Sequence, residues 1–287
     1  MLTGAVAYPL ISYLSFITPY LIFTMLFLTF CKLPPRDIHL HPAHLWLLLI
    51  QLIGCLVTYA LVQIYDPIVA QGAFMCVLVP TATAAAVVTG LLGGNVAFLT
   101  TYLMLCNTAV AIVAPLLLPL VGSHPEPFIN VFLLICKQVG PILICPLLLA
   151  WLIRYTLPKV NEKLISIHNL SFYLWAVALT VVTAQMVNFF MKEETHNYKV
   201  EISLAIASLI ICVSQFIIGR RIGRHYGDPV SSGQGLGQKN TILAMWMSQA
   251  YLNPLSSIGP ATYILWQNII NSYQLWLRNK NTPKNIK

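Results

Sequence analysis

Nine long apolar stretches follow one another along this chain, and little sequence is left between them. The composition agrees, because the 287 residues are 58% hydrophobic and only 8% charged, with a mean hydropathy of +0.77. An ordinary soluble domain is about a quarter charged, and a helix needs about 20 apolar residues to cross a bilayer. We therefore predict an all-α polytopic membrane protein with about nine transmembrane helices and no soluble catalytic domain. The expected spans are 9–30, 45–64, 70–92, 96–120, 128–153, 168–190, 200–219, 231–252 and 257–277.

The net charge is +8, and the basic residues between the apolar stretches lie in alternate loops and the C-terminal tail, with only Lys192 and Lys199 in the opposite set of loops. Cytoplasmic loops of membrane proteins are rich in Lys and Arg, so the N-terminus is expected outside and the C-terminus in the cytoplasm. The first residues lack the basic region of a cleavable signal peptide. The basic charge thus indicates topology in a lipid bilayer, and no nucleic-acid partner is expected. The basic set is Lys32, Arg36, Arg154, Lys159, Lys163, Arg220, Arg221, Arg224, Arg278, Lys280, Lys284 and Lys287.

Neither the cysteines nor the histidines form a metal-binding pattern. All seven cysteines lie within or at the ends of apolar stretches, without a CxxC pair, and are interpreted as small packing residues. His39, His41 and His44 cluster in the first cytoplasmic loop, where solvated side chains are expected. We find no nucleophile–base pair, HExxH motif or carboxylate dyad in the spans, so no enzyme, metal or cofactor is predicted.

Lys239 lies inside an apolar stretch, within the polar and glycine-rich run 233–240. A lysine at the bilayer centre costs roughly 3 kcal/mol on insertion scales, so it is tolerated only beside a polar path. A broken helix at membrane depth is tolerated only where it is buried in protein or lines a cavity, and in transporters such breaks bind substrate and ions. The run therefore predicts a transporter. The alternative is that Lys239 extends toward the membrane surface, as long cations near helix ends do.

A second interruption, Pro80 followed by Thr81, Ala82 and Thr83, falls in the third apolar stretch. Spans one to four precede spans six to nine by a nearly constant offset, and an offset of five spans reverses orientation. We therefore predict inverted-topology repeats with two discontinuous helices that meet near the midplane. The first repeat, 1–121, has four spans; the second, 122–278, has five; and 279–287 is a basic cytoplasmic tail. Pro80 could instead merely kink a helix.

Four stretches resemble the bile acid:sodium symporter family. Residues 23–28 (FTMLFL), followed by Arg36-Asp37, are similar to the family's first conserved helix, and residues 80–97, ending in GNVA, to its first broken helix. Residues 237–244 (GQKNTILA) resemble the pattern E-x-G-x-Q-N-x-x-L-A, and residues 266–269 (WQNI) resemble W-H-N-I. The resemblance is to bacterial nine-span members. It implies a core domain with the two crossed broken helices, a panel domain, and a location in the bacterial cytoplasmic membrane.

The sodium ligands of that family are largely absent from the matching positions. The Ser-Asn pair of the first broken helix corresponds to Ala85 and Ala86, and the hydroxyls of the next helix to Leu99 and Leu103. The Glu and Gln of the second broken helix correspond to Gly235 and Lys239, although a shift of one residue would put Gln238 in the ligand position. Only Gln51 matches a family ligand. We therefore expect degenerate sodium sites, in which Lys239, with Gln51 and Gln238 nearby, replaces an ion.

The two breaks, one fixed lysine and no acidic residue deep in a span favour an anionic substrate. The resemblance agrees, since it implies bile salts, pantoate-like acids or other organic acids. We expect a secondary transporter of a small organic anion working by alternating access, independent of sodium. The alternatives are sodium- or proton-coupled symport, the latter with Lys239 carrying the proton, and a membrane protein that binds without transporting. The sequence does not predict an oligomeric state. Expected substrate contacts are Thr81, Thr83, Asn240, Thr241, Gln267 and Asn268.

Overall fold

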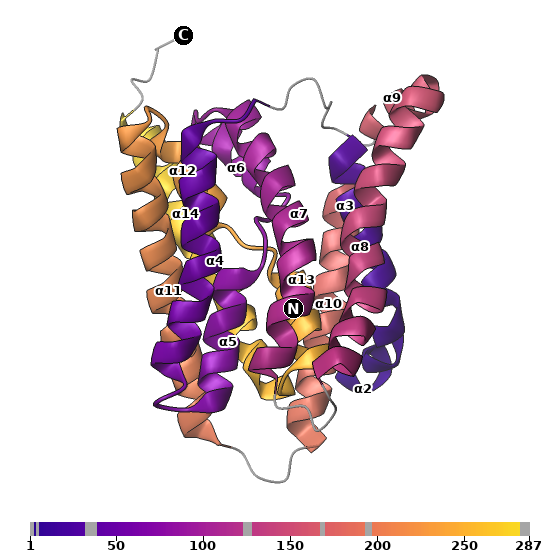
Figure 1. The fold of residues 1–287 in the computed structure, drawn as a ribbon, viewed down its shortest axis with the longest axis vertical. Coiled ribbons are helices and arrows are strands. Elements are labelled where there is room, and N and C mark those ends of the chain that lie inside the picture. Colours follow the sequence, from indigo (N-terminus) through magenta and orange to yellow (C-terminus); the bar gives the residue numbers. More distant parts are fainter. Residues whose placement is uncertain are drawn as a thin grey trace.

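The protein folds into helices joined by short loops, as seen in a computed structural model that describes residues 3, 6–31, 39–122, 128–166, 170–192 and 197–281 (Figure 1). Lys32, Arg36, Lys284 and Lys287 of the predicted basic set, and most of the predicted tail, lie outside these residues. The elements in chain order are α2 (Tyr8–Ile11), η1 (Ser12–Ile17), α3 (Thr18–Cys31), α4 (Pro42–Val62), α5 (Pro67–Leu78), α6 (Ala85–Leu91), α7 (Val96–Val121), α8 (Phe128–Thr156), α9 (Pro158–Ser166), α10 (Leu170–Lys192), α11 (Tyr198–His225), α12 (Pro229–Gly237), α13 (Thr241–Tyr251), η3 (Pro254–Ser257) and α14 (Ile258–Asn281).

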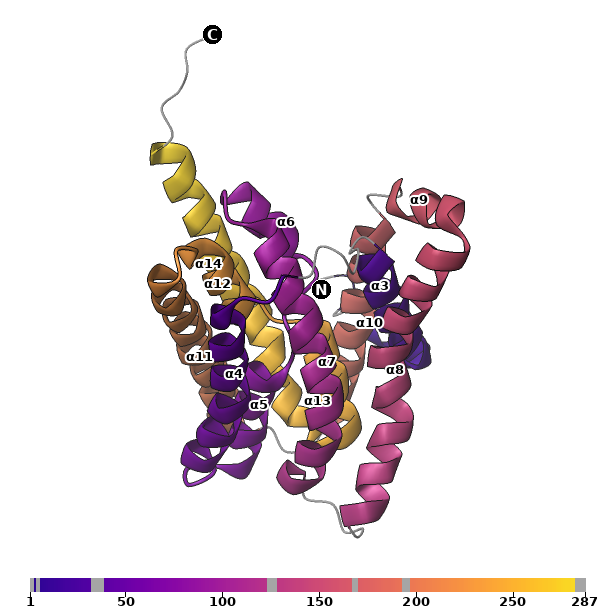
Figure 2. The same ribbon diagram turned by 45° about the horizontal axis from the view of Figure 1, so that its top comes forward.

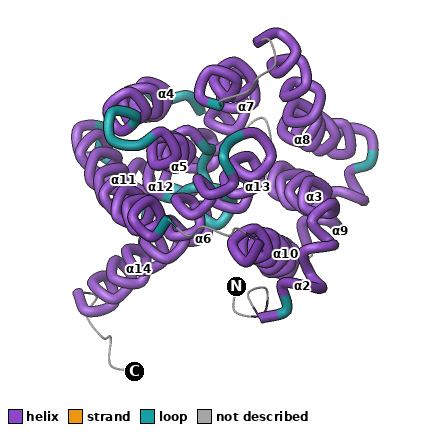
Figure 3. Tube along the Cα trace, turned by 90° about the horizontal axis from the view of Figure 1, so that it is seen from below, coloured by secondary structure: helices purple, strands orange, loops and turns teal. Residues whose placement is uncertain are grey.

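The helices form two groups in space. α3 packs with α8, α9 and α10 in the smaller group, and the remaining long helices form the larger group (Figure 2). Seen along the long axis, α5 and α12 lie among α4, α7, α11 and α14 (Figure 3), all of which contact one or both of them. The groups meet where α7 contacts α8 and where α13 contacts α3 and α10. The two groups therefore do not follow the two halves of the chain, since α3 packs with helices from the second half.

Polar side chains in the loops begin many of the helices. Asp66, Asn95, Asn197 and Asp228 each accept a hydrogen bond from a backbone N–H in the first turn of the helix that follows. Proline is the first residue of α4, α5, α9 and α12, where its missing N–H costs nothing. These caps satisfy N–H groups that would otherwise lack partners, and they define where each helix starts.

The outer surface of the bundle is apolar, as a lipid-facing surface must be. On α11, Ile202, Ile206, Ile210 and Ile217 repeat at helical spacing and are all exposed. Within the described residues, four helical segments are long and apolar enough to cross a membrane by length and composition: Tyr8–Cys31, Pro42–Val62, Val96–Val121 and Tyr198–His225. These observations confirm the prediction of an all-α polytopic membrane protein. The number of nine spans stays a prediction, because the other apolar helical segments are shorter.

Candidate functional site

The two helix breaks pair with each other in the middle of the larger group. Thr81, between α5 and α6, forms an antiparallel bridge with Lys239, between α12 and α13. The Ala82 amide donates to the Gln238 carbonyl at 3.0 Å, and the Asn240 amide donates to the Pro80 carbonyl at 2.8 Å. These bonds satisfy backbone groups that a membrane interior would otherwise leave unpaired. The interruption at Pro80 is therefore a break that pairs with the second break, and not merely a kink.

Lys239 is buried at this crossing, with 1% of its surface exposed. Its Nζ donates to the Val77 carbonyl at 3.0 Å, and its backbone amide donates to Oε1 of Gln267 at 3.0 Å. Three thiols, those of Cys55, Cys76 and Cys106, lie near enough to interact electrostatically with the ammonium. No carboxylate in the described part of the chain does so. By contrast Lys137, in the apolar α8, is exposed. The alternative that Lys239 extends toward the membrane surface is therefore wrong.

Each backbone carbonyl from Val77 to Pro80, at the end of α5 and directly after it, accepts a hydrogen bond. A helix leaves its last four carbonyls without intrahelical partners, and its C-terminal end carries partial negative charge. Gln51 on α4 donates from Nε2 to the Leu78 and Val79 carbonyls at 2.7 and 3.0 Å. Lys239 Nζ donates a hydrogen bond to the Val77 carbonyl, and the Asn240 backbone amide donates one to the Pro80 carbonyl. A side-chain cation, a side-chain amide and a backbone amide thus replace the next helical turn.

Replacing Gln51 by leucine should destabilise the protein by about 2 kcal/mol. The substitution leaves two buried carbonyls and the Tyr102 hydroxyl, which donates to Gln51 Oε1 at 2.9 Å, without partners. The measurement is the thermal unfolding midpoint in detergent, compared with Gln63→Leu at the exposed end of the same helix. Equal midpoints for the two variants would show that Gln51 contributes nothing to the crossing.

A small cavity of about 70 Å³ lies between the crossing and α3. Its apolar wall consists of Ile22, Met25 and Leu26 on α3. Its other wall is the paired helix breaks and part of α14, with predominantly polar groups. These residues are Ala82, Thr83, Ala84, Gln238, Lys239, Asn240, Thr241, Ile242, Gln267 and Asn268. The cavity therefore combines an apolar surface from one helix group with polar groups from the other.

Five of the six expected substrate contacts line this cavity, namely Thr83, Asn240, Thr241, Gln267 and Asn268. Of the expected ion-site residues, Gln238 and Lys239 also line it, whereas Gln51 lies behind the crossing on α4. The structure thus brings together residues from the first break, the second break and α14. Whether they contact a substrate stays a prediction.

Thr81 is not among the lining residues. Its side chain is buried, and its hydroxyl donates to the Gly235 carbonyl at 2.6 Å. Thr81 therefore donates to a carbonyl near the C-terminal end of α12, just as Gln51 donates to carbonyls at the C-terminal end of α5. The second half of the first broken helix begins at Ala85, after a short segment that is not helical. Thr81 belongs to the paired segment before that helix, which sequence periodicity cannot distinguish from its first turn.

The positions that match family sodium ligands are closed by apolar packing. Ala85, Leu99 and Leu103 are fully buried and offer no side-chain oxygen. A Cβ placed on Gly235 would lie 2.9 Å from Cδ1 of Tyr102, so the ring occupies the space where a longer side chain would start. No group of three or more His, Cys, Asp or Glu side chains in the described residues is arranged to hold a metal ion.

The histidines of the first loop differ from expectation. His41 caps α4 and accepts from the Ala43 amide at 3.2 Å. His44 lies inside α4, only 2% exposed, with Nε2 at 3.0 Å from the Phe98 carbonyl. The expectation of a solvated side chain is wrong for His44, because α4 begins before it and turns its ring toward α7.

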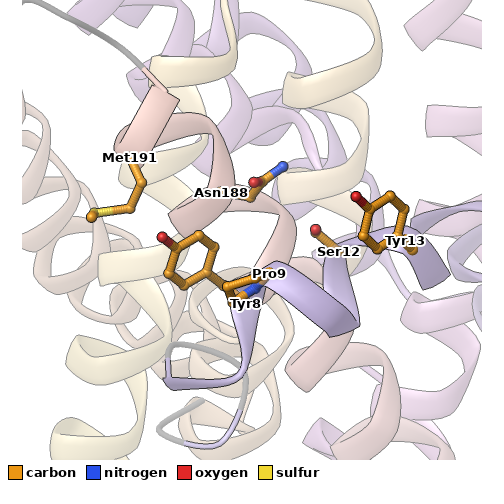
Figure 4. Close-up of a pocket in the computed structure, with 6 residues that line it drawn as sticks. All are labelled: Tyr8, Pro9, Ser12, Tyr13, Asn188 and Met191. Atoms are coloured by element: carbon orange, nitrogen blue, oxygen red, sulfur yellow. The ribbon is translucent and has the colours of Figure 1, made fainter.

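A second, wider cavity of about 380 Å³ lies away from the crossing, between the first segment of the chain and α10. Figure 4 shows Tyr8, Pro9, Ser12 and Tyr13 on one side and Asn188 and Met191 on the other. It contains hydroxyl and amide groups but no charged side chain. Sequence reasoning indicated none of these residues, because they belong to no motif.

The sequence reasoning also missed two similar glutamine–tyrosine pairs. Gln51 on α4 pairs with Tyr102 on α7, and Gln215 on α11 pairs with Tyr263 on α14 at 3.1 Å. Gln215 additionally donates to the Cys76 carbonyl, and Tyr263 donates to the Gly237 carbonyl at 2.7 Å. Each pair thus supports a helix break. A glutamine within an otherwise apolar stretch is the signal that could have identified both pairs.

A membrane-spanning helical bundle with two broken helices paired at a buried site has the architecture of a secondary transporter. Residues 19–193 match the Sodium Bile acid symporter family, and the chain belongs to this family. It is a multi-pass membrane transporter of organic anions, and not an enzyme. The match includes the first helix break and ends before α11, so the break with Lys239 lies outside it. No curated protein matches the sequence significantly.

Proposed function

We propose that this protein carries a small organic anion across the membrane by alternating access without sodium, and that the Lys239 ammonium takes the place of the ion. The observation that carries the proposal is the hydrogen bond from the buried Lys239 Nζ to the Val77 carbonyl, at the broken end of α5. A lysine ammonium carries the same +1 charge as a sodium ion. It donates hydrogen bonds to the kind of oxygen that would otherwise ligate the ion. It therefore offsets the partial negative charge of the helix end without a bound ion.

The absence of oxygen-bearing side chains at the sodium-ligand positions supports the same proposal. Sodium needs a shell of oxygens, and Ala85, Leu99 and Leu103 supply none from their side chains. The Gly235 carbonyl already accepts a hydrogen bond from the Thr81 hydroxyl, and the Tyr102 ring packs against Gly235. A bound sodium ion would have to displace groups that already satisfy one another.

The cavity supports a small substrate of the pantoate-like class more than a bile-salt-like one. Sites for drug-sized ligands are typically about 300–1,000 Å³, well above the volume of about 70 Å³ here. A small organic acid, or the acidic head of a larger one, fits the polar wall beside Asn240 and Gln267. A bile salt would require the smaller helix group to move away from the crossing.

For the transport cycle, we propose that the larger group is the core and the smaller group the panel, and that the two move relative to each other. The paired breaks and the two glutamine–tyrosine pairs support an inverted repeat across residues 1–121 and 122–278. We further propose a bacterial cytoplasmic membrane, with the N-terminus outside. Basic residues at the ends of α8, α11 and α14, and on α9, support that orientation.

The test is uptake of labelled organic anions into proteoliposomes, with sodium or choline as the only external cation. We expect equal initial rates in the two cations for at least one carboxylate or sulfonate. Uptake that requires sodium would contradict the proposal and favour a sodium symporter. Uptake that responds to an imposed pH gradient would favour proton coupling instead. Saturable binding without flux would favour a membrane protein that binds without transporting.

A further inference from the structure

The wider cavity, between the first segment of the chain and α10, is large enough to hold a small ligand. Its volume of about 380 Å³ lies within the range of about 300–1,000 Å³ that is typical of ligand sites. Its lining comes from α2 (Tyr8 and Pro9), η1 (Ser12 and Tyr13) and α10 (Asn188 and Met191), and α10 contacts both other elements (Figure 4). None of these lining residues belongs to the crossing, so the cavity is a separate site.

The polar groups of this cavity are available to a ligand. Within the described residues, the side chains of Tyr8, Ser12, Tyr13 and Asn188 have no hydrogen-bond partner. Hydroxyls in helices commonly donate to the carbonyl one turn earlier, as Thr24, Thr29 and Thr180 do here, each at 2.8 Å. Ser12 donates to no such carbonyl, so its hydroxyl can bind a molecule in the cavity.

The cavity lies where two membrane helices reach the membrane surface. Tyr8 begins the membrane-spanning segment Tyr8–Cys31, and Asn188 and Met191 lie in the last turns of α10. Tyrosine is enriched at this depth, because its ring is apolar and its hydroxyl is polar. The apolar side chains that follow in the first segment are exposed, namely Leu10, Leu14 and Phe16. A lipid can therefore place its acyl chains on this surface and its head group in the cavity.

The segment that lines the cavity is irregular. Ser12 and Tyr13 begin η1, a 3₁₀-helix of six residues between α2 and α3. Runs of 3₁₀-helix longer than three or four residues are uncommon, and within a longer helix they often mark a hinge or a strained sequence. A molecule that binds η1 and α10 together would hold this segment against its neighbour. A ligand in the cavity should therefore stabilise the protein.

We propose that the wider cavity binds the head group of a phospholipid that carries both an ammonium and a phosphate, as phosphatidylethanolamine does. The phosphate accepts from the hydroxyls and from the Asn188 NH₂ group. The ammonium lies against the face of a tyrosine ring and donates to side-chain oxygens. The described lining residues carry no charge, which suits a head group without net charge. An anionic head group such as that of phosphatidylglycerol would find no cation among them.

Asn188→Leu and Tyr8→Leu each remove one of these contacts. Asn188→Leu removes an amide that donates to the phosphate, and Tyr8→Leu removes a ring and a hydroxyl. Each should weaken the binding of phosphatidylethanolamine by about fivefold to thirtyfold. Tyr20→Leu is the matched control, because Tyr20 is an exposed tyrosine of the same membrane-spanning segment and does not line the cavity.

The experiment measures lipid binding to the purified full-length protein by native mass spectrometry. The probes are phosphatidylethanolamine, phosphatidylglycerol with the same acyl chains, and soluble phosphoethanolamine. We expect wild type and Tyr20→Leu to bind one phosphatidylethanolamine in preference to phosphatidylglycerol, and Asn188→Leu and Tyr8→Leu to lose that preference. In detergent, phosphatidylethanolamine should raise the unfolding midpoint of wild type, but not that of Asn188→Leu, whose midpoint without lipid should equal that of wild type.

Three results would overturn the inference. The first is phosphatidylethanolamine binding that neither Asn188→Leu nor Tyr8→Leu weakens, and the second is phosphatidylglycerol bound to wild type as tightly as phosphatidylethanolamine. The third is phosphoethanolamine bound as tightly as the phospholipid, which would make the ligand a soluble molecule with the same head group. The inference is independent of the proposed function. Selective lipid binding in a protein without flux would refute transport alone, and sodium-independent flux without selective lipid binding would refute this site alone.

Discussion

Sodium-free uptake of an organic anion should fall by about tenfold to a hundredfold when Lys239 is replaced by glutamine. The substitution removes a buried positive charge from the broken end of α5 and weakens the only side-chain bond to the Val77 carbonyl in the described structure. Glutamine can still donate to that carbonyl, so the crossing should fold, but the negative end of the helix is no longer offset. The measurement is the initial uptake rate in choline, with thermal unfolding as a check on folding.

Adding sodium to the same variant gives the more informative result. If the ammonium substitutes for an ion, sodium should restore part of the uptake in Lys239→Gln and should not change it in wild type. Lys137→Gln is the control, since Lys137 is exposed in an apolar helix. Lys239→Gln uptake equal to wild type without sodium would refute the role assigned to this residue.

Gly223→Val should destabilise the protein by at least about 3 kcal/mol and lower its unfolding midpoint by roughly 5 to 10 °C. A Cβ at Gly223 would lie 2.3 Å from the Asp228 carbonyl oxygen and 2.6 Å from Cα of Pro229, at the start of α12. These atoms belong to the backbone, so they cannot move aside without shifting α12. A Cβ at Gly219, one turn earlier, would similarly lie 2.5 Å from the Ser232 carbonyl oxygen. Small residues four apart allow such close helix packing in membranes.

Because α12 leads directly into the second break, the same variant should also lose uptake. Gly54→Ala is the matched control, since its added Cβ would have Val77 Cγ1 as nearest neighbour at an ordinary 3.7 Å. We expect Gly54→Ala to keep both the unfolding midpoint and the uptake rate. A Gly223→Val protein that unfolds at the wild-type temperature would mean that α11 and α12 are not packed as closely as described.

The positions of the helices and breaks could be read from the sequence, because each has a local cause. Long apolar runs favour membrane helices, and Pro80 and the glycine-rich run 233–240 indicate where such a helix is interrupted, although α12 continues to Gly237 before the second break. The pairing of the two breaks followed from their matching places in the proposed repeat, and the bridge between Thr81 and Lys239 is its structural counterpart.

Other features depend on contacts between distant segments, which no local pattern specifies. The Thr81 hydroxyl donates to the carbonyl of Gly235, which lies far along the chain. Thr81 was expected to contact the substrate, but its side chain instead stabilises the paired breaks. The burial of His44 depends on Phe98 of α7. The short helix α9 was missed because it is amphipathic and too short to register as a span, although Pro158 begins it.

The candidate site likewise combines a residue that a local sequence pattern identifies with residues whose roles depend on contacts between distant segments. Lys239 stood out because a charge inside an apolar stretch is costly wherever the chain goes. Tyr102 and Gln215 attracted no attention, because aromatic and amide side chains in membrane helices usually pack against a neighbouring helix. Their roles at the crossing became apparent only when the carbonyls at each broken helix end were traced to their donors.

The central claim is that the protein needs no sodium ion because Lys239 occupies its place, and sodium binding to the wild-type protein tests this most directly. A ligand present at 100 times its Kd stabilises a protein by about 2.7 kcal/mol, a shift of several degrees in the unfolding midpoint. The measurement is the midpoint of purified wild type as sodium replaces choline at constant ionic strength. We predict no sodium-specific change. A saturable rise with sodium that potassium does not reproduce would contradict the account.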